Sequence, residues 1–151
     1  MDGLRGHGWV RAAAGAAAGL TVAAGLGARA LLGGEPAKAA GDALYTVLVY
    51  ALVVLVAPRV RPWRAAVTAS VVSWAVEFLQ LTGVPEELGR RSTPARLVLG
   101  STFNPPDLFW YLVGALSAAL VHRALSALRG RRVHRGRRVL RTERPAAPDR
   151  V

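Results

Sequence analysis

Cysteine is absent from this chain of 151 residues, which excludes disulfide bonds and thiolate chemistry. Histidine is scarce as well: His7, His122 and His134 lie far apart and lack the spacing of metal ligands. The sequence also lacks a nucleophile motif, a cluster of metal ligands and a phosphate-binding loop. We therefore predict neither a cofactor nor a bound metal, and no catalytic residue can be named from a motif.

Acidic residues are few, because nine Asp and Glu stand against twenty Lys and Arg, which gives a formal net charge of +11. The excess is concentrated near the C-terminus: from Arg123 onward, ten Arg face only Glu143 and Asp149, a net charge of +8. A basic tail of this kind favours contact with anionic membrane lipid, at about 1 kcal/mol per residue near the surface. Nucleic acid is not expected as a partner, because the charge has no interleaved aromatic residues and no nucleic-acid-binding fold behind it.

Polar residues are too few for a soluble domain of this size, since 52% of residues are hydrophobic and the mean hydropathy is +0.30. The apolar residues occur in blocks, as they do in membrane spans. We predict an all-α, polytopic membrane protein with one transmembrane domain at residues 12–122, a bundle of four helices at about 12–32, 39–57, 65–82 and 106–122. A Gly/Pro loop is expected at 33–41, a polar loop at 83–105 and a basic, largely disordered tail at 123–151.

The first apolar block consists mostly of Ala and Gly, which makes it the weakest of the four predicted spans. Its Gly15-xxx-Gly19 spacing suits close helix packing in a membrane, although a general bias toward Ala and Gly would give the same pattern. Residues 1–30 could instead act as a signal peptide, with Arg5 and Arg11 before an apolar stretch and a poor cleavage site around Arg29.

The basic residues predict the orientation of the bundle. Arg59, Arg61 and Arg64 crowd the shortest loop, and with four spans this loop shares a side with both termini. The positive-inside rule places that side in the cytoplasm. We therefore predict a multi-pass protein of the plasma membrane with N- and C-termini in the cytoplasm, where 1–11 forms the N-terminal segment.

Polar side chains of the predicted helices then fall in one layer that faces away from the cytoplasm. Glu77 lies about 18 Å and Gln80 about 22 Å along the third helix, because each residue of an α-helix rises 1.5 Å. An ionised carboxylate costs several kcal/mol in lipid, so Glu77 is expected to face the bundle and to pair with Arg29 or Arg96. The predicted ligand-binding residues are Arg29, Asp42, Tyr45, Glu77, Gln80, Arg96, Asp107 and Tyr111.

These residues also have simpler interpretations. Asp42 and Asp107 each begin a helix, where the helix dipole favours a carboxylate, so both could serve only as caps. Tyr45 and Tyr111 could serve only as anchors at the membrane interface.

Several short segments resemble the DUF2809 family of small bacterial membrane proteins, which is similar in layout to VanZ-like proteins. The matching pieces are Gly41-Asp42-Ala43-Leu44-Tyr45, Glu77-Phe78-Leu79-Gln80, Arg96-Leu97-Val98-Leu99-Gly100 with Phe103, and Asp107-xxx-Tyr111-xx-Gly114. The resemblance extends from about Arg29 to Val121. It implies the fold and the choice of residues but no reaction, and the VanZ-like relatives imply the cell envelope only by analogy.

The sequence leaves three functions open. The first is the binding of a small envelope molecule or lipid head group by the outward-facing polar layer. The second is a structural or accessory role in a homo-oligomer or a larger membrane complex. The third is an enzyme in which Asp107 and Glu77 act as an acid–base pair, which requires the two carboxyl groups to lie near each other.

Overall fold

The computed structural model describes residues 2–100 and 102–142, and the side chains of residues 8–100 and 102–130. The described part is entirely helical and contains no strand. The elements are α1 (Asp2–Leu31), α2 (Gly34–Val56), α3 (Pro62–Leu79), the short 3₁₀ helix η1 (Gln80–Thr82), α4 (Val84–Arg91), α5 (Thr93–Leu99) and α6 (Pro105–Thr142). Four of these helices are long and apolar enough to cross a membrane, with spans at Gly8–Leu31, Gly34–Val56, Pro62–Thr82 and Pro105–Gly130. The prediction of a four-helix, all-α bundle is thus confirmed.

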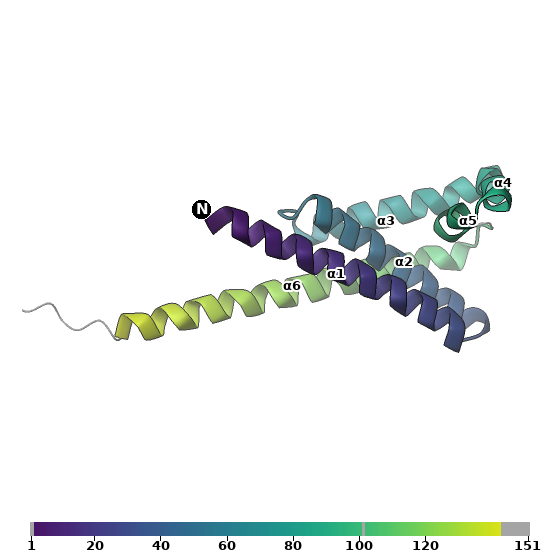
Figure 1. Cartoon of the computed structure of the whole chain (residues 1–151). Coiled ribbons are helices and arrows are strands. Elements are labelled where there is room, and N and C mark those ends of the chain that lie inside the picture. The colour runs from purple at the N-terminus through teal and green to yellow at the C-terminus, as the bar shows by residue number, and fades with distance from the viewer. Residues whose placement is uncertain (1, 101, 143–151) are drawn as a thin grey trace, which may run out of the picture.

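The long helices alternate in direction, so the molecule has two distinct ends (Figure 1). The α1–α2 turn, α4 and α5 lie at one end, which we call the cap end. The N-terminus of α1 and the α2–α3 turn lie at the other, which we call the basic end because Arg59, Arg61 and Arg64 lie there. α1 packs along α2, whereas α2, α3 and α6 pack against one another.

α2 begins several residues earlier than the sequence predicts. The segment 33–41 was expected to form a loop, but only Leu32 and Gly33 separate α1 from α2. Gly34 turns the chain with φ of +58°, a left-handed conformation that glycine adopts without strain. Pro36 then lies in the first helical turn, where a missing N–H removes no hydrogen bond. Helix α2 consequently includes Lys38, which becomes important for the polar site.

The expected polar loop at 83–105 contains two short helices instead. In α4, Arg90 forms hydrogen bonds with Glu87 and an ion pair with Glu86, and these contacts support one exposed helical turn. Hydrogen bonding from the Arg90 guanidinium lowers the pKa of the Glu87 carboxyl. Ser92 caps α5 by accepting a hydrogen bond from the backbone N–H of Ala95 at 3.4 Å.

The last helix is also longer than predicted. α6 continues to Thr142, whereas the sequence predicts a largely disordered tail from residue 123 onward. The last part of that predicted tail, residues 143–151, lies outside the described residues.

The core of the bundle is built from small side chains. Ala65, Ala69 and Ala115 have no exposed surface, which allows α3 and α6 to approach closely. α6 also lies close against α2, because a Cβ atom on Gly114 would lie 3.0 Å from the Cα atom of Ala43 and overlap its carbonyl group. Gly15 and Gly19 were expected to support packing, but among the described residues no atom of another element lies within 4 Å of the position that a Cβ atom would occupy at either glycine.

We expect Gly114→Ala to destabilise the bundle, because its methyl group would push α6 away from α2. Overpacking of this kind costs about 1–3 kcal/mol, more than the helix propensity gained by replacing glycine. The thermal unfolding midpoint of the purified protein in detergent should fall. Gly19→Ala is the matched control, since it makes the same chemical change in open space and should leave the midpoint unchanged or slightly higher.

Candidate functional site

Glu77 is the centre of a polar cluster at the cap end. Its side chain projects from the last turn of α3 and has no exposed surface. One carboxylate oxygen, Oε1, accepts a hydrogen bond from the backbone N–H of Asn104 at 2.6 Å, and Oε2 accepts one from the hydroxyl of Tyr111 at 2.8 Å. Both donors belong to α6 or to the residue just before it. The buried carboxylate is therefore satisfied by hydrogen bonds between helices.

Asn104 links Glu77 to a second carboxylate. While its backbone N–H binds Glu77, its side-chain amide donates to Oδ1 of Asp107 at 2.5 Å. Asp107 lies in the first turn of α6, where the helix dipole favours negative charge, and its residue is only 5% exposed. Its other oxygen accepts a hydrogen bond from the ammonium group of Lys38 on α2.

Lys38 also approaches Asp42, which lies one turn further along α2, with 3.5 Å between Nζ and Oδ2. This distance suits an ion pair but is too long for a good hydrogen bond. Oδ2 of Asp42 is buried and accepts no hydrogen bond from any described residue. Lys38 itself is 40% exposed along its side chain, so the Lys38–Asp42 side of the cluster is its open side.

The cluster holds an excess of negative charge and of hydrogen-bond acceptors. It holds three carboxylates, on Asp42, Glu77 and Asp107, but one ammonium group, that of Lys38, which pairs with Asp42 and Asp107. Gln80, in η1 and outside the cluster, also has an unused acceptor: its amide nitrogen donates to the carbonyl of Leu99 at 2.7 Å, but its buried Oε1 has no donor among the described residues. Such a site favours cations and hydrogen-bond donors over anions.

The structure brings together five of the eight residues that the sequence selects. Asp42, Glu77, Asp107 and Tyr111 belong to the cluster, and the ring of Tyr45 lies 6.1 Å from that of Tyr111. Gln80 lies on the α5 side of α3 and fastens α5 to it.

The prediction that Glu77 pairs with Arg29 or Arg96 is wrong. Arg29 and Arg96 are exposed, and neither forms an ion pair within the described part of the chain. Their selection as ligand-binding residues stays a prediction. The cation of the cluster is Lys38, which pairs with Asp42 and Asp107 and not with Glu77. It was predicted to lie in a loop, although its spacing of four residues from Asp42 was a usable signal. Asn104 was missed because a backbone N–H leaves no trace in the sequence.

Two further polar pairs lie inside the bundle between the cluster and the basic end. Thr46 and Ser73 share a buried hydrogen bond of 2.9 Å between α2 and α3. Nearer the basic end, the hydroxyl of Tyr50 lies 2.8 Å from Nδ1 of His122 on α6. Each pair satisfies its own polar atoms and joins neighbouring helices.

The geometry is compatible with the acid–base hypothesis in one respect, because Glu77 and Asp107 both bind Asn104 and so lie near each other. The described part of the chain contains no group of three or more side chains that could hold a metal ion.

The comparisons with known proteins identify a family. The family model described as a protein of unknown function (DUF2809) matches residues 35–115, which is just over half of the chain. This range contains α3, α4, α5, nearly all of α2 and the first turns of α6, and therefore every residue of the polar cluster. Neither the curated proteins nor the solved structures contain a match to this chain.

We expect Lys38→Met to destabilise the protein by about 1–3 kcal/mol, because it leaves Asp42 and Asp107 without their cation in a partly buried site. Adding Asp107→Asn should recover part of this loss, so the effects of the two substitutions should not be additive. Thermal unfolding in detergent of the two single variants and the double variant measures this coupling. Arg90→Met is the control, because the exposed ion pairs of Arg90 are worth little; additive effects at Lys38 and Asp107 would contradict the assignment.

Proposed function

The chain belongs to the DUF2809 family, and on this premise we propose that it is a multi-pass protein of the plasma membrane whose polar cluster binds the amine group of a small envelope molecule or lipid head group. The observation that carries the proposal is the composition of the cluster. The cluster contains three carboxylates and one lysine, and the buried Oδ2 of Asp42 accepts no hydrogen bond from a described residue. A primary ammonium group supplies both the positive charge and the donor that this oxygen needs.

The exposure of the cluster supports a binding position beside α2. Lys38 and Asp42 are partly exposed, whereas Glu77 and Asp107 are buried and already hydrogen-bonded. An incoming ammonium group would bind Asp42, and an accompanying phosphate would lie near Lys38. Glu77 would then act as a positioning residue, because through Asn104 it fixes Asp107, which in turn holds Lys38.

The test compares two lipids that differ only in the donors of the head group. Phosphatidylethanolamine carries an ammonium group with three N–H donors, and phosphatidylcholine carries a quaternary nitrogen with none. We expect protein reconstituted in an equal mixture of the two to retain phosphatidylethanolamine about tenfold more, since a hydrogen bond to a charged group is worth about 1.5 kcal/mol or more. Native mass spectrometry of the protein released from nanodiscs measures the ratio of retained lipids.

Asp42→Asn should remove most of this preference, while Glu35→Gln, an exposed acid in the first turn of the same helix, should keep it. Equal retention of the two lipids by the unsubstituted protein, or equal loss of preference in both variants, would refute amine binding at Asp42. An accessory subunit would show no such preference in any variant.

The proposed orientation has the basic end in the cytoplasm and the cap end outside, following the positive-inside rule. The absence of cysteine makes it simple to test, because a single introduced cysteine has no background. We expect Glu86→Cys in α4 to react with a membrane-impermeant maleimide added to intact cells, and Arg61→Cys in the α2–α3 turn to react only after the cells are broken. The reverse pattern would place the polar cluster on the cytoplasmic side.

A further inference from the structure

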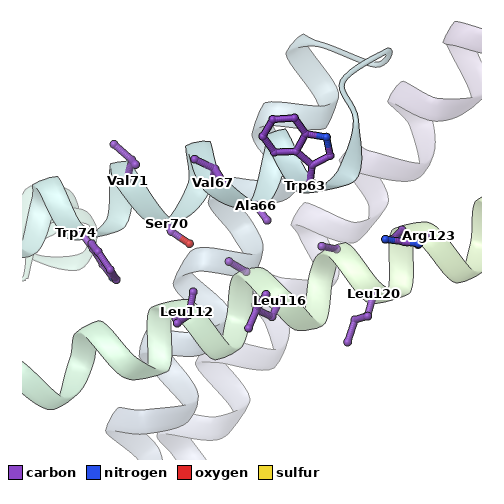
Figure 2. Close-up of a pocket in the computed structure, with 12 residues that line it drawn as sticks. Trp63, Ala66, Val67, Ser70, Val71, Trp74, Leu112, Leu116, Leu120 and Arg123 are labelled. Atoms are coloured by element: carbon purple, nitrogen blue, oxygen red, sulfur yellow. The ribbon is translucent and has the colours of Figure 1, made fainter.

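The surface of the bundle carries a groove between α3 and α6 whose lining shares no residue with the polar cluster. It has a volume of about 450 Å³ and an almost entirely apolar lining. The lining includes Ala66, Val67, Val71, Leu112, Leu116 and Leu120 (Figure 2). Ser70 is the one polar residue of its middle part.

The two ends of the groove differ in chemistry. At the basic end lie Trp63 and Arg123 (Figure 2). The guanidinium of Arg64 lies 5.2 Å from the centre of the Trp63 ring. At the other end lies Trp74, whose indole N–H donates to the carbonyl of Leu108 at 3.2 Å and so ties α3 to α6. One end of the groove therefore carries positive charge, and at the other end a hydrogen bond joins α3 to α6.

The length of the groove matches a lipid tail. Trp63 and Trp74 are separated by about 16 Å along α3, which is about half of the 30 Å hydrocarbon core of a bilayer. An extended acyl chain from one leaflet fits this length.

The distribution of charge along the bundle favours an anionic head group at the basic end of the groove. The acidic residues whose side chains the structure describes are Glu35, Asp42, Glu77, Glu86, Glu87 and Asp107, and all lie toward the cap end. Arg123 consequently forms no ion pair with a described carboxylate, although its guanidinium can bind two oxygens of a phosphate side by side. The exposed indole of Trp63 suits the depth of lipid head groups.

We propose that this groove is a binding site for an anionic phospholipid, with one acyl chain between α3 and α6 and the phosphate held by Arg123. The site does not depend on the function proposed for the polar cluster. Its proposed phosphate position, at Arg123, lies toward the opposite end of the bundle, and the lining of the groove shares no residue with the cluster. It also differs from a diffuse attraction of lipid to the basic tail, because it requires one arginine and one apolar groove.

The experiment uses the tryptophans that flank the groove as reporters. In a Trp9→Phe/Trp110→Phe background, the remaining fluorescence comes from Trp63 and Trp74. The full-length protein is reconstituted in phosphatidylcholine vesicles that contain a small fraction of phosphatidylglycerol with dibrominated, quenching acyl chains. We expect about fivefold more quenching than the same fraction of dibrominated phosphatidylcholine gives, which corresponds to one basic residue near the membrane surface.

Three substitutions decide whether the site is the one proposed. Arg123→Gln should remove the preference for phosphatidylglycerol, and Val67→Phe, on an exposed lining position, should reduce it by filling the groove. Arg61→Gln removes the same charge from the α2–α3 turn without altering the lining, and should keep the preference. Quenching equal for the two brominated lipids would overturn the proposal, as would an equal loss of preference in Arg61→Gln, which would reveal a general charge effect.

Discussion

A carboxylate among transmembrane helices needs hydrogen-bond donors, and the arrangement of this bundle depends on how Glu77 obtains them. Its two oxygens bind the backbone of Asn104 and the hydroxyl of Tyr111, so α3 and the start of α6 must lie side by side at the cap end. Asp107 then lies within reach of Asn104, and Lys38 on α2 neutralises it. The packing of small residues permits these contacts, because α6 and α2 touch where Gly114 packs against Ala43.

The parts of this arrangement that follow from regular geometry could be predicted from the sequence. The four spans follow from blocks of apolar residues, and the helical rise of 1.5 Å per residue places Glu77 at the depth of Asp107. An error of two residues in a helix boundary shifts this depth by only about 3 Å. The layer of polar residues was therefore predictable even though several boundaries were wrong.

The parts that depend on side-chain direction or on backbone atoms could not be predicted. Arg29 and Asp42 were expected at the same depth, but depth does not determine which way a side chain points, and Arg29 is exposed and forms no ion pair with the described carboxylates of the cluster. Lys38 was assigned to a loop because glycine and proline surround it, whereas here glycine starts the helix and proline sits in its first turn. Asn104 acts partly through its main chain, which every residue has.

The double role of Asn104 also fastens the connection at the cap end. Because it is bonded to Glu77 on α3 and to Asp107 on α6, the connection that leads from α5 into α6 is fastened on both sides. Gln80 fastens α5 itself through the carbonyl of Leu99. The short helices are thus fastened at the cap end, while the side chains of Lys38 and Asp42 keep more exposed surface than that of Asp107. If the cluster binds a head group as proposed, a lateral approach past Lys38 and Asp42 would admit molecules that already reside in the bilayer more readily than solutes arriving from water.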